Sequence, residues 1–291
     1  MYIGCLKSEE LFDNSLLDLI FKIAKLINVI FENITFKNFN LVNQSLIENN
    51  GQIQFINCKF INNISFKKTL IENKHNVFLK GSVFLNNFSK KKSLIHNHYD
   101  LDISSCKFIN NDSYSQGGVI TNELKAKIDN VDFMSNKSKS RAGVMHNVNQ
   151  RCTLEISNSK LSHNASNIDA GAILNYGKIN IMKTEFNNNY SKANGGAIYS
   201  GGGDVTVNDA VFAYNSCEEY GSSIINRNDC LLTVNDSKFI NNFSWKNKGV
   251  ISNFDNAVIK AYNCKFNHND VIPIYFTNNE NVFLENCKLM K

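Results

Sequence analysis

Basic side chains stand in three short segments and could bind an anionic ligand together. Lys67 and Lys68 form the first segment, Lys90, Lys91 and Lys92 the second, and Lys137, Lys139 and Arg141 the third. Ammonium and guanidinium groups on one surface attract anions such as acidic glycans. The alternative is a series of solvated loops in a chain that is rich in lysine. We take these residues, which we name the basic set, as a possible anionic-ligand face.

Acidic residues make a weaker case for catalysis. A polysaccharide lyase or hydrolase needs paired carboxylates at a defined separation, or acidic calcium ligands beside a basic proton acceptor. Asp100 and Asp102 are close in sequence, as are Asp129 and Asp132, but neither pair has a second acidic cluster at the equivalent position of the neighbouring repeat. We therefore predict no catalytic residues, and a carbohydrate-active enzyme is the alternative.

Histidine and cysteine positions predict neither a metal site nor a cofactor site. His96 and His146 are equivalent in the repeat, with Thr121 at the position between them, so a strand spacing of about 4.8 Å puts them about 10 Å apart. His163 and His268 fall in asparagine-rich turns, and we expect all four histidines to be exposed. The eight cysteines match no paired zinc motif, and some are expected to be small core residues.

An aromatic residue followed three positions later by asparagine recurs about every 25 residues. The pairs are Phe60 with Asn63, Phe84 with Asn87, Phe108 with Asn111, Phe133 with Asn136, Phe186 with Asn189, Phe212 with Asn215, Phe239 with Asn242, Phe266 with Asn269, and Leu161 with Asn164 in one repeat. Many of these asparagines also begin an Asn-x-Ser glycosylation sequence, as Asn63, Asn87 and Asn111 do. On an exported protein such turns could carry glycan, although the repeat itself generates the match.

A second set of positions keeps the same phase. It comprises Ile47, Ile71, Ile95, Ile120, Met145, Ile173, Ile198, Ile224 and Ile251, each with a small residue two positions before it and, in all repeats but one, asparagine two positions after it. Between the two sets lie segments in which polar and apolar residues alternate, such as Lys178-Ile179-Asn180-Ile181. This alternation indicates strands with one buried face. Each repeat therefore holds about three short strands separated by turns.

These periods predict an all-β, single-stranded right-handed parallel β-helix of the pectin-lyase-like kind, with about eleven coils of about 25 residues. Phe and Ile fill the interior in this fold. Asparagine suits the turns because it tolerates a left-handed backbone, and stacked asparagines can bond one another. Stacked coils also gather the basic set along one side of the rod.

The N-terminal residues predict a cap on the first coil, whose strand edges are otherwise unpaired. Residues 8–27 fit an amphipathic helix with the apolar stripe Leu16, Leu17, Ile20, Phe21, Ala24 and Ile27. We predict an N-terminal region with this capping helix over residues 1–30 and the β-helix over residues 31–291. The last repeat is incomplete, which favours a piece of a longer protein with flanking domains, or an end-to-end oligomer.

The motifs Gly195-Gly196-Ala197-Ile198 and Phe186-Asn187-Asn188-Asn189 resemble the paired GGAI and FxxN motifs of chlamydial polymorphic outer membrane proteins. Similar repeats occur in adhesin-like proteins of methanogenic archaea and trichomonad parasites. The resemblance covers roughly residues 31–291 and implies a surface-displayed β-helix used in adhesion. The chain has no recognisable C-terminal membrane barrel, so the resemblance does not extend to autotransport.

These observations predict a non-catalytic, adhesin-like module at the cell surface or outside the cell, which binds acidic glycans or partner surfaces. The net charge of +5 is too small to indicate nucleic acid. The apolar stretch from residue 16 to residue 31 is interrupted by charged residues, so we predict no membrane span. The alternative is a polysaccharide lyase or hydrolase on the same scaffold.

Overall fold

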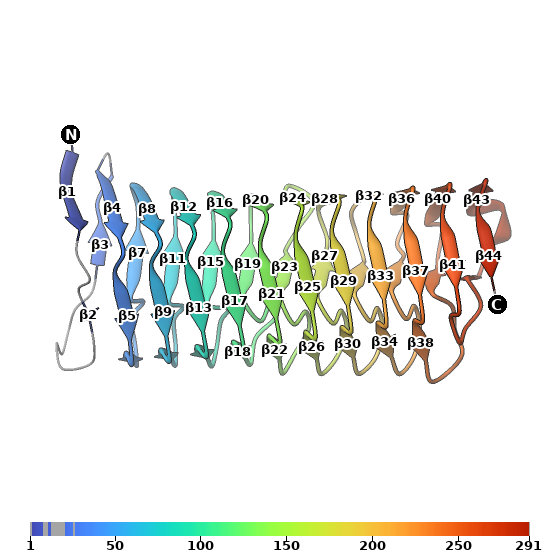
Figure 1. The fold of residues 1–291 in the computed structure, drawn as a ribbon, viewed down its shortest axis with the longest axis horizontal. Helices are drawn as coiled ribbons and strands as arrows, with labels where there is room; N and C mark the ends of the chain where they lie inside the picture. Colours follow the sequence, from blue (N-terminus) through green and yellow to red (C-terminus); the bar gives the residue numbers. More distant parts are fainter. Residues whose placement is uncertain (1, 8–10, 13–20, 26, 291) are drawn as a thin grey trace.

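The protein is a right-handed parallel β-helix of about eleven coils. Figure 1 shows it from the side, with the long axis of the rod horizontal. The computed structural model describes residues 2–7, 11–12, 21–25 and 27–290. Strands pair in parallel, and successive coils supply neighbouring strands to four long sheets, which we name A to D. The predicted fold class is confirmed.

Sheet A carries the alternating segments. Its strands are β1 (Tyr2–Lys7), β4 (Asn28–Glu32), β8 (Gln52–Ile56), β12 (Asn76–Lys80), β16 (Asp100–Ser104), β20 (Lys125–Asp129), β24 (Thr153–Ser157), β28 (Lys178–Met182), β32 (Val205–Asn208), β36 (Leu231–Asn235), β40 (Val258–Tyr262) and β43 (Val282–Glu285). Along β8, Ile53 and Phe55 point inward and are buried, while their neighbours are half-buried. This is the period of two that one buried sheet face requires.

Sheet B carries the recurring phenylalanine. Its strands are β2 (Leu11–Phe12), β5 (Thr35–Lys37), β9 (Lys59–Ile61), β13 (Val83–Leu85), β17 (Lys107–Ile109), β21 (Asp132–Met134), β25 (Lys160–Ser162), β29 (Glu185–Asn187), β33 (Val211–Ala213), β37 (Lys238–Ile240), β41 (Lys265–Asn267) and β44 (Lys288–Met290). The middle residue points inward, and the lysine before it is exposed in strands such as β9 and β17.

Sheet C carries the recurring isoleucine. Its strands are β3 (Phe21–Ile23), β7 (Ile47–Asn49), β11 (Ile71–Asn73), β15 (Ile95–Asn97), β19 (Ile120–Asn122), β23 (Met145–Asn147), β27 (Ile173–Asn175), β31 (Ile198–Ser200), β35 (Ile224–Asn226), β39 (Ile251–Asn253) and β42 (Ile274–Phe276). The first and third residues of these strands are buried from β7 to β39, so the middle residue faces outward. A short 3-10 helix, η1 (Asn279–Asn281), follows β42.

Sheet D corrects the prediction of three strands per coil. It consists of β6 (Asn40–Leu41), β10 (Ile64–Ser65), β14 (Phe88–Ser89), β18 (Asp112–Ser113), β22 (Lys137–Ser138), β26 (Ala165–Ser166), β30 (Tyr190–Ser191), β34 (Ser216–Cys217) and β38 (Phe243–Ser244). Strands of two residues are too short to show an alternating pattern in the sequence.

Aromatic rings stack in one row inside the coils, which a leucine interrupts at one position. The ring centroids of Phe60 and Phe84 lie 4.3 Å apart, those of Phe84 and Phe108 4.6 Å, and those of Phe108 and Phe133 4.9 Å. These separations are close to the spacing of paired strands, which is about 4.8 Å. Leu161 occupies the row in the next coil, and stacking resumes from Phe186.

The motif asparagines point inward and form a hydrogen-bonded ladder. Asn111 is fully buried, and its Nδ2 donates to Asn136 Oδ1 at 2.9 Å and to the Phe84 carbonyl at 3.0 Å. Its Oδ1 accepts from the backbone N–H of Asn87 at 3.0 Å and from Asn87 Nδ2 at 2.9 Å. The predicted bonding between stacked asparagines is confirmed.

The structure confirms that asparagines in the turns adopt a left-handed backbone, although the motif asparagines themselves do not. The residue before each motif asparagine adopts it, as at Asn62 with φ of 54° and Asn86 with φ of 55°. In the folded chain Asn63 and Asn111 are buried within the ladder, so their side chains are not accessible for glycosylation.

Close packing between coils explains why glycine stands before several strands of sheet C. A Cβ on Gly171 would overlap the carbonyl oxygen of Gly196 in the next coil, and a Cβ on Gly143 would overlap that of Gly171. The turn between sheets D and C can therefore pack this closely only when these positions lack a side chain.

The predicted N-terminal helix is wrong wherever the structure describes it. Leu11–Phe12 and Phe21–Ile23 are strands β2 and β3, which pair with β5 and β7. Pairing with the neighbouring coil therefore overrides the helical spacing of the apolar residues. Residues 8–10, 13–20 and 26 lie outside the described residues. The division of domains at residue 30 stays a prediction. Within the described part of the chain, no helix has the length and apolarity to cross a membrane.

Replacing Asn111 by alanine should lower the free energy of unfolding by about 3 kcal/mol or more, because buried donors and an acceptor in Asn87 and Phe84 lose their partner. Urea denaturation followed by circular dichroism measures the change. The exposed Lys107 in the same coil is the control, since Lys107→Ala should change stability by no more than about 0.5 kcal/mol. Equal stability of the two variants would contradict a role for the ladder.

Candidate functional site

The outward side of sheet C brings together titratable and aromatic side chains from successive coils. We define the sheet-C face as the outward middle residues of its strands and the residues that directly follow those strands. The middle residues are Glu48, Glu72, His96, Thr121, His146, Leu174, Tyr199, Ile225, Ser252 and Tyr275. The following residues are Asn50, Lys74, His98, Glu123, Val148, Tyr176, Gly201, Arg227, Phe254 and Thr277.

Two histidines and two glutamates form a compact cluster on this face. His98 Nε2 lies 2.6 Å from Glu72 Oε1, and His98 Nδ1 lies 2.7 Å from Glu123 Oε2. His96 Nε2 lies 2.8 Å from Glu123 Oε1. The residues come from β11, β15 and the turns after β15 and β19, so three successive coils build the cluster.

Burial and hydrogen bonding act against each other in this cluster. Burial opposes ionisation of Glu123, but the hydrogen bonds from His96 and His98 outweigh it and lower the pKa of this carboxyl. Burial lowers the pKa of His96, against the opposing effect of its hydrogen bond to Glu123. A neutral His96 fits its second contact, because Lys92 Nζ lies 3.1 Å from His96 Nδ1 and can donate to it.

A charged hollow of about 310 Å³ adjoins the cluster toward the N-terminus. Its lining includes Lys22, Lys68 and Glu72, together with Lys74 Nζ, which lies 2.6 Å from Glu48 Oε1. The hydrogen bond from Lys74 lowers the pKa of Glu48. Cations and carboxylates alternate here, so the hollow offers both positive charge and hydrogen-bond acceptors.

Toward the C-terminus the sheet-C face becomes aromatic. Arg227 Nη1 donates to the Tyr199 hydroxyl at 3.3 Å, and its guanidinium lies 5.9 Å from the centre of the Phe254 ring. These residues line a hollow of about 260 Å³ with Tyr220. Lys248 lies 4.8 Å from the centre of the Tyr275 ring. Arg227, Phe254, Lys248 and Tyr275 are each half-buried, so each is partly open at the surface.

Arg141 links the two halves of the face. Its Nε lies 3.2 Å from Asp169 Oδ2, and its Nη1 can donate to the Tyr176 hydroxyl at 3.4 Å. The ring of Tyr176 lies edge-on to His146, with centroids 5.9 Å apart. The face is therefore continuous from its ionic part to its aromatic part.

The structure divides the basic set between two surfaces. Lys68 lines the charged hollow, and Lys92 and Arg141 turn toward the sheet-C face. The remaining members, Lys67, Lys90, Lys91, Lys137 and Lys139, are exposed at or near sheet D and the turn that follows it. The coil between the one with Lys90 and Lys91 and the one with Lys137 and Lys139 carries Tyr114, Ser115 and Gln116 instead of lysine. The row of lysines is therefore interrupted. Ligand binding by the basic set stays a prediction.

The coils beside the paired aspartates supply no second acidic pair at the matching positions. Asp100 and Asp102 stand beside Lys125 and Lys127 of the neighbouring strand. Asp129 accepts hydrogen bonds from Ser157 and Asn158, both at 2.7 Å, and these bonds lower its pKa. Asp132 stands beside Lys107 and Lys160 of the two neighbouring strands.

The prediction of exposed histidines is correct for His163 and His268. It is wrong for His146, which is buried, and for His96, whose side chain is only 12% exposed. Sequence reasoning missed Glu72, His98 and Glu123 because it compared histidines only with histidines. The signal was present, since Glu72 directly precedes His96 in one row and His98 directly precedes Glu123 in the other. Reading all residue types along each row would have found the cluster.

Among the described residues, the cysteines behave as core residues. Cys58 and Cys106 are buried in the row next to the phenylalanines, and burial raises the pKa of each thiol to about 11. Burial raises the pKa of Cys217 to about 12. These thiols stay protonated near neutral pH, so they are poor nucleophiles and poor metal ligands.

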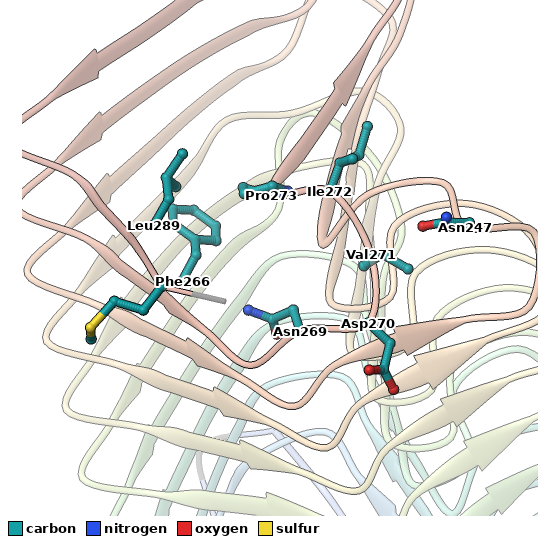
Figure 2. A pocket seen from close by; sticks show the side chains of 9 residues that line it. Asn247, Phe266, Asn269, Asp270, Val271, Ile272, Pro273 and Leu289 are labelled. Atoms are coloured by element: carbon teal, nitrogen blue, oxygen red, sulfur yellow. The ribbon is translucent and has the colours of Figure 1, made fainter.

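A cavity of about 490 Å³ opens at the C-terminal end of the rod (Figure 2). Phe266 and Leu289 of the interior row border it, with Val271, Ile272 and Pro273 on the segment that replaces sheet D in this coil. Its lining is mostly apolar and offers no convergent set of catalytic groups. An end-to-end oligomer or flanking domain stays a prediction.

The fold and this face define the class of the chain as a parallel β-helix protein with one long polar and aromatic side. Comparisons with protein-family models, curated proteins and solved structures each found no match. The resemblance to the chlamydial proteins therefore rests on the two sequence motifs.

His146 should make the protein sensitive to acid. Burial lowers its pKa from 6.5 to about 4, with a further lowering from Arg141, so the unfolded chain binds a proton between these pH values and the folded chain does not. Its contribution to stability is complete above pH 6.5 and falls as the pH drops toward 4. The loss amounts to about 3 kcal/mol.

The free energy of unfolding, measured from pH 7.5 to pH 4, tests this expectation. His146→Leu should lose less stability on acidification than the wild-type protein, whereas the exposed-site control His163→Gln should follow the wild type. Parallel curves for all three proteins would show that His146 is not protected from protonation.

Proposed function

We propose that the chain is a non-catalytic, adhesin-like module that binds an extended acidic glycan along the sheet-C face. The observation that carries this proposal is the continuity of the face, on which aromatic rings and cations stand at the spacing of the coils. A sugar chain is long, narrow and amphipathic, and a straight row of ring faces and charges matches that shape.

The aromatic half supplies apolar surface for sugar rings. Tyr199, Phe254 and Tyr275 present rings on one side of the rod, where they can pack against the C–H groups of a pyranose. Arg227 and Lys248 lie beside these rings and can pair with uronate carboxylates or sulfate groups.

The basic set adds a longer-range attraction for the same ligand. Lys68, Lys92 and Arg141 stand on or beside the face, and the exposed lysines of the neighbouring turn surround it with positive potential. Location at the cell surface or outside the cell is part of the proposal, and the GGAI and FxxN motifs support it by resemblance.

A carbohydrate-active enzyme is the second candidate, and the His–Glu cluster is the observation that favours it. Glu72 and Glu123 are two carboxylates on opposite sides of the His98 ring, within reach of a glycan that follows the face. We place it second because each carboxylate is engaged by histidine hydrogen bonds.

Isothermal titration with oligogalacturonate, an acidic glycan, tests the binding proposal against cello-oligosaccharide as the neutral probe. The double variant Tyr199→Ala/Arg227→Ala should weaken oligogalacturonate binding about tenfold or more, which corresponds to about 1.4 kcal/mol. Trp245→Ala removes an aromatic that is 60% exposed on another side of the rod and should leave binding unchanged.

The triple variant Lys90→Ala/Lys91→Ala/Lys92→Ala separates the basic set from the aromatic half. Its loss of affinity should shrink as salt rises, because screening already weakens the same attraction in the wild type. Binding equal to the wild type in both multiple variants would overturn the proposal. Release of unsaturated or reducing ends from the probes would establish the enzyme instead.

A further inference from the structure

Glu123 fixes the proton positions of both histidines in the cluster. Its Oε1 accepts from His96 Nε2 at 2.8 Å, and its Oε2 accepts from His98 Nδ1 at 2.7 Å. Each imidazole therefore carries a proton on the nitrogen that faces Glu123 when the ring is neutral. The lone pairs that remain are on His96 Nδ1 and His98 Nε2.

Both lone pairs converge on one carboxylate oxygen. Glu72 Oε1 lies 3.6 Å from His96 Nδ1 and 2.6 Å from His98 Nε2, a hydrogen-bond distance, so a bound ion would take the place of the proton shared between His98 and Glu72. One possible ligand atom from each of Glu72, His96 and His98 lies within 4.8 Å of the other two. Ligand atoms on a tetrahedral zinc ion lie roughly 3.3 Å apart, given metal–ligand distances of about 2.0–2.1 Å.

A buried acceptor beside these atoms lacks a hydrogen bond. Glu72 is 8% exposed, and its Oε2 has no hydrogen-bond partner. The nearest cation in an ion pair with Oε2 is Lys92 Nζ at 3.7 Å. A buried carboxylate oxygen without a donor is costly, so the site gains from a cation that binds closer.

From this geometry we propose that Glu72, His96 and His98 bind one divalent transition-metal ion of the zinc class. Two imidazoles and one carboxylate form the donor set that zinc and ferrous ions take in sites with open coordination positions. Glu123 is then a positioning residue, because it orients both ligand histidines without touching the ion.

The ammonium group of Lys92 competes with the metal ion for this site. Its Nζ lies 3.1 Å from His96 Nδ1, a ligand atom of the proposed site, and 3.7 Å from Oε2 of the ligand carboxylate of Glu72. The ammonium must turn away into solvent when the ion binds, and its side chain is 34% exposed, so such a movement is open to it. This competition gives the proposal a test in which a substitution strengthens binding.

The experiment is isothermal titration of the purified full chain with zinc chloride near neutral pH, repeated with cobalt(II) to record its visible absorption. The wild type should bind one ion per chain at this site. His98→Ala should weaken binding by at least about a hundredfold, and Glu123→Gln by about 10- to 100-fold, because a glutamine cannot accept from both histidines. Lys92→Met should bind the ion several-fold more tightly than the wild type.

Glu48→Gln is the matched control, because Glu48 stands next to Glu72 in the same row and contacts no histidine of the cluster. It should bind the ion as the wild type does. Circular dichroism checks that each variant is folded, and the gain in Lys92→Met cannot arise from misfolding. Equal affinity of wild type and His98→Ala, or no gain in Lys92→Met, would overturn the site. The inference does not rest on glycan binding, so either can fail alone.

Discussion

The structure depends on one constraint, which is that identical or similar side chains must lie above one another at the spacing of paired strands. Phe60, Phe84 and Phe108 stack at 4.3 and 4.6 Å because their strands pair in exact register. The asparagine ladder obeys the same register, since Asn111 bonds the equivalent residue on each side. A slip by one residue would turn these rows outward and bury charged residues in their place.

The same constraint organises the outside of the rod. Outward residues of successive coils become neighbours whatever their distance in the sequence, so charge and aromaticity form rows instead of scattered points. Glu72 meets His98 across 26 residues, and Arg227 meets Tyr199 across 28. A binding face or an ion site thus arises from single substitutions in a repeat, without any change of backbone.

The outward residues of sheet C show this effect most clearly. Its middle residues are flanked by the close glycine-bearing turn on one side and by the residue after the strand on the other, so they are partly covered and partly open. Burial of this degree strengthens electrostatic contacts that water would weaken on a fully exposed strand. It lowers the pKa of His146 and holds the His–Glu cluster together, whereas the outward lysines of sheet B stay solvated.

The sequence by itself determined the repeat, the inward rows of Phe and Ile, the bonding between asparagines and hence the parallel β-helix. It could do so because one register applies to every coil, and a period of about 25 residues repeats the same signal. It missed sheet D and predicted a helix where β2 and β3 pair with the coils, because short strands carry little periodic signal. Only the tertiary structure decided which side chains of different coils meet. The contact of Glu72, His96, His98 and Glu123 depends on side-chain direction and on turn packing, which a single row of residues does not specify.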